Sequence, residues 1–268
     1  MKVAGNLFKM RSSIKDDTVN YQLVLKDSVV EMNELIGKSL SLEFKNQINC
    51  ISCGKKTAKS FAQGFCYNCF QTAPEVEECV LNPEKCRAHL GESRDQTWAE
   101  KHCLIPHYVY LAIASGIKVG VTRSTQIPTR WIDQGAWKAI IIAETPNRHI
   151  AGVIENYLKQ HYSDKTNWRS MLKNVLANEI DIELEKEKAL ALLPAELQKY
   201  AKEDSTPLEL VFPVDAFPTK PNSFTFDKEA KIEGTLKGIK GQYLMFDNDR
   251  VINIRRHNGY LVELDTED

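Results

Sequence analysis

Hydrophobic and polar residues alternate along both ends of the chain, which is the period of a β-strand with one buried face. Near the N-terminus the pattern covers three short stretches: VAGNLFKM, TVNYQLVL and SLSLEFK. Towards the C-terminus it covers five more: SFTFD, KIEGTLKGI, QYLMF, RVINIRR and GYLVEL. Both ends are therefore predicted to be β structure, and the pattern leaves open whether they complete one small barrel or one sheet.

The middle of the chain changes to a mixture of strands and helices. Three apolar stretches, HYVYLAIA, IKVGVT and KAIIIAE, predict strands, and Ser115-Gly116 suits a hairpin turn between the first two. The next stretch, HIAGVIENYLKQHY, has helical spacing, because Ile150, Ile154 and Leu158 fall on one face. Residues 171–203 continue the helical pattern, with an interruption at Pro194. These elements predict an α+β fold.

Two CxxC pairs, Cys50/Cys53 and Cys66/Cys69, are separated by twelve residues. Each pair can supply two thiolates from one tight turn, and four thiolates satisfy a tetrahedral Zn²⁺ ion. A redox CxxC is a weaker alternative, because such motifs usually occur singly in a βαβ context. The spacing predicts a closed, structural zinc site in a zinc ribbon, and such a module contacts nucleic acid or protein without itself defining a reaction.

The other three cysteines lie among histidines before residue 108. Imidazole and thiolate combine freely at zinc, so Cys79, Cys86, His89 and Cys103 could hold a second Zn²⁺ ion. The alternative is that these cysteines are small buried residues and that the histidines lie on the surface. Their spacing follows no common zinc motif, so both interpretations stay open.

Composition limits the classes of protein to be considered. Of the 268 residues, 43% are hydrophobic and 26% are charged, which is typical of a globular protein. No apolar stretch approaches the ~20 residues of a bilayer-spanning helix, and the N-terminus lacks the apolar core of a signal peptide. We therefore expect a cytoplasmic protein without a membrane partner, whose cysteines are thiols or metal ligands. Because the net charge is −1, a nucleic-acid site would have to be a local patch of basic residues.

Several short motifs follow one another from Tyr108 onward. They are YVYL (108–111), Lys118-Val119-Gly120 followed by Val121-Thr122-Arg123, Arg130 in PTRW, Glu155 in AGVIENYLK and Asn167 in KTNW. Their order over about 60 residues resembles that of the GIY-YIG nucleases, in which a two-stranded hairpin precedes a helix with an arginine and a later helix with a glutamate. The whole chain, with a cysteine-rich segment before PTRWIDQGAW, is also similar to a bacterial zinc-ribbon family of unknown function.

The resemblance to GIY-YIG nucleases implies a site that cleaves phosphodiesters in DNA or RNA. It implies catalytic roles for Tyr110, Lys118, Arg130 and Glu155. It implies substrate contacts for Tyr108, Thr122, Arg123 and Asn167. The chemistry agrees, because one carboxylate such as Glu155 can hold Mg²⁺ or Mn²⁺ and an arginine can bind a phosphate. Lys118 departs from the family, which has a tyrosine there, and a lysine is a poor general base unless its pKa is lowered.

The same residues also have simpler interpretations. A tyrosine of the first strand could have a packing role alone. Glu155 could be an exposed helix residue, and Arg130 could stack on Trp131. Arg148 precedes the Glu155 helix and could bind an anion at its N-terminus. The leading hypothesis is a nucleic-acid-binding protein with a metal-dependent nuclease site. The alternative is a non-catalytic, zinc-stapled adaptor that holds nucleic acid or a protein partner.

The C-terminal β stretch is locally basic. Between residues 231 and 256, three acidic residues accompany six basic ones: Lys231, Lys237, Lys240, Arg250, Arg255 and Arg256. Basic side chains with nearby aromatics suit single-stranded nucleic acid. An ordinary antiparallel sheet with a solvated charged face explains the same pattern, and we prefer it.

The predicted organisation has five segments. A zinc ribbon and a GIY-YIG-like three-stranded sheet with helices are flanked by β segments at both ends. The segments are an N-terminal β segment (1–49), a zinc-binding module (50–107), a GIY-YIG-like domain (108–175), a helical segment (176–205) and a C-terminal β segment (206–268).

Overall fold

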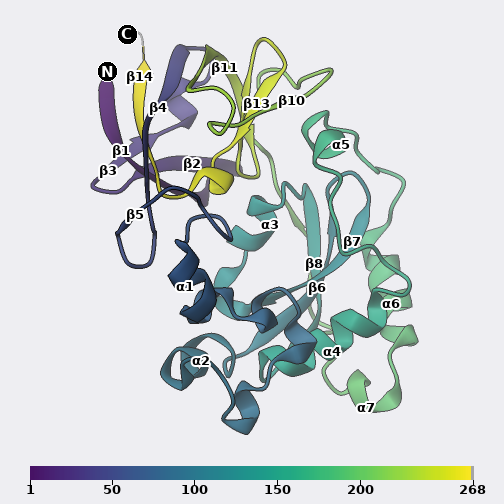
Figure 1. The fold of residues 1–268 in the computed structure, drawn as a ribbon. Coiled ribbons are helices and arrows are strands. Elements are labelled where there is room, and N and C mark those ends of the chain that lie inside the picture. Colours follow the sequence, from purple (N-terminus) through teal and green to yellow (C-terminus); the bar gives the residue numbers. More distant parts are fainter. Residues whose placement is uncertain (267–268) are drawn as a thin grey trace. The chain divides into compact units, whose positions relative to one another are not determined.

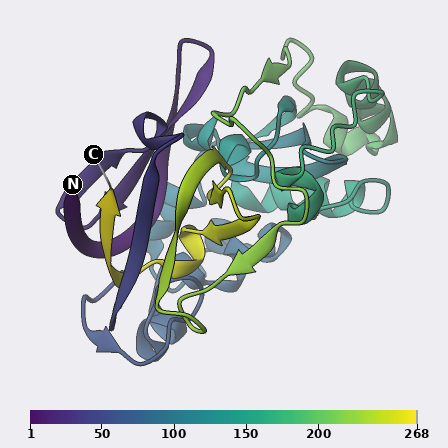
Figure 2. The ribbon, with the colours of Figure 1, turned by 90° about the horizontal axis from the view of Figure 1, so that it is seen from above.

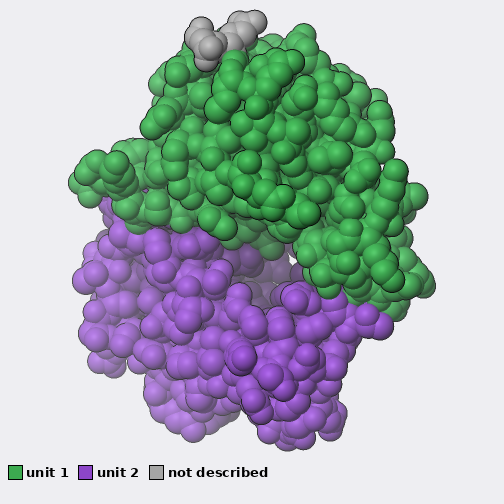
Figure 3. All heavy atoms as spheres, turned by 90° about the vertical axis from the view of Figure 1, so that its left-hand side faces the viewer, with its two compact units in different colours: residues 1–71, 172–174, 211–268 green, residues 72–171, 175–210 purple. Residues whose placement is uncertain are grey.

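The computed structural model describes residues 1–266, and the chain forms two compact units, coloured separately in Figure 3. Unit 1 contains residues 1–71, 172–174 and 211 onward, and unit 2 contains residues 72–171 and 175–210. The division at residue 71 falls between the CxxC pairs and the other three cysteines. It also lies inside the range 50–107 that the sequence assigns to one zinc-binding module.

Unit 1 is built on a large sheet, drawn in purple and yellow in Figure 1. Within residues 1–266 it has ten strands in the order β10-β13-β12-β11-β4-β14-β1-β2-β3, with β5 paired to β4. From the N-terminal part come β1 (Lys2–Lys15), β2 (Thr18–Leu25), β3 (Ser28–Glu31), β4 (Ser39–Asn49) and β5 (Lys56–Thr57). From the C-terminal part come β10 (Asn222–Phe224), β11 (Lys231–Lys240), β12 (Tyr243–Phe246), β13 (Arg250–Asn253) and β14 (Tyr260–Thr266).

The two ends of the chain meet in this sheet. Strand β14 lies between β1 and β4 and pairs antiparallel with both, so that Leu264 is opposite Val3 on one side and Leu42 on the other (Figure 2). Its alternate residues Val262 and Leu264 are fully buried, which is what the alternating sequence pattern predicts for a strand with one buried face. The β-rich ends therefore complete one sheet.

Unit 2 has a smaller antiparallel sheet, coloured teal in Figure 1, with the strand order β7-β6-β8-β9. The strands are β6 (His107–Ile113), β7 (Ile117–Arg123), β8 (Lys138–Thr145) and β9 (Leu208–Glu209). The helices of the chain are α1 (Tyr67–Thr72), α2 (Gln96–His102), α3 (Thr129–Asp133), α4 (Arg148–Leu158), α5 (Trp168–Leu172), α6 (Ile182–Leu192) and α7 (Ala195–Gln198). The mixed α+β class predicted from the sequence is confirmed.

Helix α4 covers the sheet of unit 2 with its apolar face. Asn147 caps the helix by accepting a hydrogen bond from the Ile150 N–H at 3.0 Å. Ala151, Ile154 and Leu158 are fully buried, as helical spacing requires for one packed face. They share a core with residues of the sheet and of α6: Val109, Leu111, Val119, Ile140, Ile142, Ile182 and Ala189. This packing fixes the helix that carries Glu155.

The basic C-terminal strand differs from the solvated face that we expected. Lys240 is only 1% exposed, and its Nζ donates to the Asn174 Oδ1 at 2.9 Å. Its ammonium group also lies over the rings of Phe212 and Phe217, at 5.3 and 5.6 Å from their centroids. The predicted solvated face is therefore wrong at Lys240, because residues distant in sequence enclose its charge. Across residues 1–266, no helix combines the length and the apolar character needed to span a membrane.

Candidate functional site

Four cysteines of unit 1, which we call the first cysteine group, converge on one point: Cys50, Cys53, Cys66 and Cys69. Their sulfur atoms all lie within 4.8 Å of one another, and all four are free thiols. The Cys53 and Cys66 sulfurs are 3.8 Å apart. A tetrahedral Zn²⁺ with Zn–S bonds of ~2.3 Å separates its sulfur ligands by about 3.8 Å, so this edge already has the spacing that zinc requires.

Two turns position the first cysteine group. Cys50 follows β4, and the chain reverses through Gly54, whose φ of 72° favours glycine, before β5 pairs back onto β4. Cys66 precedes α1, and Cys69 lies within that helix. Burial alone would raise the pKa of Cys50, but backbone N–H groups of Cys53, Cys66 and Ser52 lower it to about 6. The thiolate is thus favoured at Cys50, whereas burial raises the pKa of Cys69 to about 12. The positions of the four sulfurs make the group compatible with a zinc ribbon.

Three cysteines of unit 2 form the second cysteine group: Cys79, Cys86 and Cys103. Their sulfurs also lie within 4.8 Å of one another, and the three residues are between 1% and 6% exposed. Hydrogen bonds among the three thiols lower the pKa of Cys86 and raise that of Cys79, while the charge of Arg148 favours the thiolate at both. From the positions of their sulfurs, both cysteine groups could hold a metal ion such as zinc.

His89, the predicted fourth ligand of the second ion, makes a different contact. Its side chain is exposed, and its ring stacks on that of His149 with centroids 4.6 Å apart. Among residues 1–266 the second group contains the three cysteines alone. The structure therefore brings together three of the four residues that the sequence proposes for this site.

The second cysteine group is built against the first turn of α4. Arg148 opens the helix, and its guanidinium donates to the carbonyl oxygens of Cys79 and His102 at 3.2 and 3.1 Å. Arg148 is thus engaged with backbone carbonyls, rather than with the anion that the sequence suggested. A β-carbon on Gly152 would lie 2.1 Å from the Glu84 backbone nitrogen, so only glycine lets the turn Pro83–Lys85 pack on this helix.

The predicted catalytic residues form a second feature of unit 2, which we call the polar cluster: Tyr110, Lys118, Arg130 and Glu155. In the β6–β7 hairpin, Tyr110 is opposite Gly120, and Ala112 is opposite Lys118. The Tyr110 hydroxyl lies so close over Gly120 that an added β-carbon would be 2.6 Å from it. The hydroxyl donates to the Gln134 Oε1 at 3.0 Å. Glycine at 120 is what allows the tyrosine to lie flat across the hairpin.

Arg130 connects the members of the polar cluster. Its positive charge acts on Tyr110, Lys118 and Glu155, and lowers the pKa of the Tyr110 hydroxyl against the effect of burial. Glu155 on α4 is 8% exposed and forms an ion pair with Lys159 at 3.4 Å. Burial raises the pKa of Glu155, while Lys159 and Arg130 oppose that rise. Residues from two strands and two helices therefore meet in one electrostatically coupled group.

Lys118 is buried within this group at 6% exposure. Burial and the neighbouring positive charge of Arg130 lower its pKa to about 8, against the opposing effect of Glu155 and Asp164. A substantial fraction of the amine is then neutral near pH 8. Lys118 meets the condition under which a lysine can accept a proton.

The four residues expected to contact substrate are dispersed. Tyr108 pairs with Thr122 across the hairpin, next to Tyr110. Arg123 is opposite His107, and the charges that act on it are those of Arg148 and Cys103, so it lies towards the second cysteine group. The exposed Asn167 uses its Oδ1 to accept from the N–H groups at the start of α5, at 3.1 and 3.2 Å. The sequence motifs did not assign Gln134, the acceptor for Tyr110.

A family model describes most of the chain that contains both cysteine groups and the polar cluster. The match covers residues 37–262, and the family is described as proteins of unknown function (DUF2797). The chain belongs to the DUF2797 family. Comparisons with curated proteins and with solved structures found no match. The DUF2797 segment spans parts of unit 1 and the whole of unit 2, so both cysteine groups and all residues of the polar cluster lie within it.

Proposed function

We propose that this DUF2797 protein binds a nucleic acid and hydrolyses a phosphodiester bond at the polar cluster, with one Mg²⁺ or Mn²⁺ ion. The observation that carries the proposal is the electrostatic coupling of the buried Tyr110, Lys118 and Glu155 with the half-buried Arg130. Burying several charged groups is costly, and such clusters are found most often where chemistry uses them. The succession of a hairpin, an arginine helix and a glutamate helix also agrees with the resemblance to GIY-YIG nucleases.

Each residue of the polar cluster has a role in this proposal. Arg130 binds a phosphate oxygen, because its planar guanidinium can donate two parallel hydrogen bonds. Glu155 holds the divalent ion, which stabilises the charge that develops on phosphorus. Lys118, with its pKa lowered to about 8, accepts a proton from the attacking water. Tyr110 orients Arg130 and keeps its hydroxyl in the hydrogen-bonded network with Gln134.

The cysteine groups have a supporting role in the same proposal. Zinc at the first group holds together the two turns at the ends of the segment 50–69. Zinc at the second group fixes the segment that packs on α4, the helix of Glu155. Neither ion takes part in the hydrolysis.

A second candidate is a module that binds nucleic acid without cutting it. The Tyr110 side chain is completely buried and its hydroxyl is committed to Gln134 and Arg130, which favours a positioning role over proton transfer. If Lys118 stays protonated in the complex, it is a phosphate contact instead of a base. A protein partner is the remaining alternative.

The test compares cleavage with binding in the same variant. Glu155→Gln keeps the shape of the side chain but removes its charge, so Mg²⁺-dependent cleavage of labelled single- and double-stranded DNA and RNA should fall by about 10²–10³-fold. Binding should change little, because phosphate contacts elsewhere provide most of the salt-dependent affinity. Glu187→Gln, an exposed carboxylate of α6, is the matched control and should cleave like the wild type.

The outcomes separate the candidates. Wild-type protein that binds an oligonucleotide with a steep salt dependence but cleaves none of the substrates supports the non-catalytic module. If the wild-type protein neither binds nor cleaves the oligonucleotides, both nucleic-acid functions are excluded and contact with a protein partner is the remaining candidate. Cleavage that persists in Glu155→Gln contradicts the assignment of the metal to that carboxylate.

A further inference from the structure

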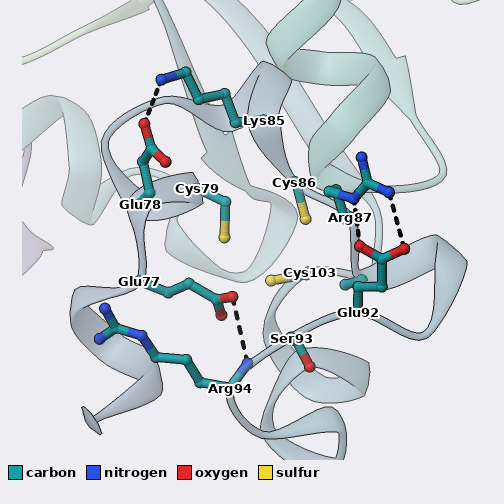
Figure 4. A pocket seen from close by; sticks show the side chains of 11 residues that line it. Glu77, Glu78, Cys79, Lys85, Cys86, Arg87, Glu92, Ser93, Arg94 and Cys103 are labelled. Carbon is teal, nitrogen blue, oxygen red and sulfur yellow. Dashed lines mark hydrogen bonds and ion pairs between the residues drawn. The ribbon is translucent and has the colours of Figure 1, made fainter. Parts of the chain in front are cut away.

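The second cysteine group faces a pocket of about 430 Å³ (Figure 4). The sulfurs of Cys79, Cys86 and Cys103, which line this pocket, point towards one another. The other lining residues are mainly charged or polar: Glu77, Glu78, Lys85, Arg87, Glu92, Ser93 and Arg94. A metal ion held by the three sulfurs would therefore have one side directed at the pocket.

Zinc needs a fourth donor. Within residues 1–266, no histidine, aspartate or glutamate atom joins the three sulfurs inside 4.8 Å. His102 and His107 each use Nδ1 with a backbone carbonyl at 2.8 Å, those of Trp98 and Ile105. A histidine that binds zinc usually has its other ring nitrogen bonded in this way, and the Nε2 of His107 is buried with no hydrogen-bond partner in the described chain. His107 is therefore one candidate for a fourth protein ligand. Structural zinc sites are closed by four protein ligands, whereas a site with three keeps an exchangeable position.

Glu77 is the one carboxylate of the pocket that could close the site. Its Oε1 accepts a hydrogen bond from the Arg94 N–H at 3.3 Å, drawn in Figure 4. Its Oε2 is buried and has no hydrogen-bond partner within the described chain. The role of Glu77 therefore has to be separated from that of an external ligand by experiment.

The charges around the pocket indicate the kind of ligand. Three basic residues line the pocket. Lys85 pairs with Glu78, Arg87 donates to Glu92 at 2.8 Å, and the Arg94 guanidinium donates to the Ala73 carbonyl at 2.9 Å, so each of them already has a partner and the rim does not favour a phosphate. Three thiolates and Zn²⁺ carry a net charge of −1, which the adjacent Arg148 offsets. A neutral, sulfur-rich metal site prefers a soft donor, and a thiol meets that preference when it binds as thiolate and releases its proton to solvent.

We propose that Cys79, Cys86 and Cys103 bind a Zn²⁺ ion whose fourth position, directed into the pocket, takes an exchangeable small thiol in preference to water. The inference is independent of phosphodiester cleavage, since it uses residues outside the polar cluster. In this proposal the second cysteine group both stabilises the fold and binds a ligand.

The test replaces zinc by Co²⁺ in the full chain and follows the visible absorption of the metal. Adding 2-mercaptoethanol should change the spectrum of the wild type along a saturable curve. Cys86→Ala, which retains only the first cysteine group, is the control and should show no such change. Azide should produce a weaker change, because it is a harder ligand than a thiolate.

Three results would overturn the proposal. One is a wild-type spectrum that responds to neither probe. Another is a spectrum that responds only in Glu77→Gln or only in His107→Gln, which would show that a side chain of the protein fills the fourth position. The third is a zinc content of one ion per chain. If Cys86→Ala does not fold, X-ray absorption of the wild-type zinc protein with and without 2-mercaptoethanol decides the question. A thiol that enters the fourth position raises the average from about 3.5 to four sulfurs per zinc, whereas a position that a protein nitrogen or oxygen fills stays at about 3.5.

Discussion

The two cysteine groups are made of the same side chain but are assembled differently. The first takes its four thiols from two local turns within residues 50–69, and Cys53 at its edge is exposed. The second takes three buried thiols from residues 79–103, and helix α4, from later in the chain, supports it because Arg148 donates to the Cys79 carbonyl. The first group is placed by its own turns, whereas the second also packs against a helix outside its own segment.

This difference has a consequence for function. The turn Pro83–Lys85 next to Cys86 lies directly on Gly152, one turn of α4 before Glu155. Metal at the second group is thus linked through this packing to α4, the helix that carries Glu155 of the polar cluster. The comparison predicts that the two metals protect different parts of the chain.

The largest expected effect comes from removing one ligand of each group. Cys53→Ala and Cys86→Ala should each lose about one equivalent of zinc, since apparent free energies of structural zinc binding are on the order of 10 kcal/mol and depend on all ligands. Hydrogen exchange should increase in residues 50–70 for Cys53→Ala, and in α4 for Cys86→Ala. Elemental analysis and exchange mass spectrometry measure both effects. If hydrogen exchange in α4 were the same in the two variants, the proposed dependence of this helix on the second cysteine group would be wrong.

A smaller effect should follow from filling the contact between the turn and the helix. Gly152→Ala should destabilise the protein by about 1–3 kcal/mol, because the new β-carbon collides with backbone that cannot move aside. This loss should appear despite the ~1 kcal/mol by which alanine normally favours a helix. Gly116→Ala in the β6–β7 turn is the control, because a β-carbon there meets no atom within 4 Å. Urea unfolding compares them, and equal stability of Gly152→Ala and wild type would contradict the packing argument.

The sequence predicted the elements that depend on local pattern. The five C-terminal β stretches correspond to β10 to β14, and the HYVYLAIA–IKVGVT hairpin corresponds to β6 and β7. The sequence did not predict that β14 inserts between β1 and β4, because strand pairing over more than 200 residues leaves no local signal. Nor did it reveal the burial of Lys240, whose partners Asn174, Phe212 and Phe217 are distant in sequence.

The candidate sites show the same limit. The spacing of the CxxC pairs was enough to place the first cysteine group, because each turn brings its two thiols together by itself. No common spacing relates the three cysteines of the second group, so proximity in the sequence suggested His89 as the fourth ligand, but the His89 ring stacks on that of His149. The lowered pKa of Lys118 was also beyond the sequence, because it arises from burial and from Arg130.

The most direct test of the polar cluster is the pH dependence of Mg²⁺-dependent cleavage. If neutral Lys118 is the base, the rate should rise about tenfold per pH unit up to its pKa of about 8 and level off above it. Lys118→Arg, which stays protonated, should lose the rise together with most of the activity. Cleavage that is independent of pH between 6 and 9, or that is unchanged in Lys118→Arg, would contradict the account.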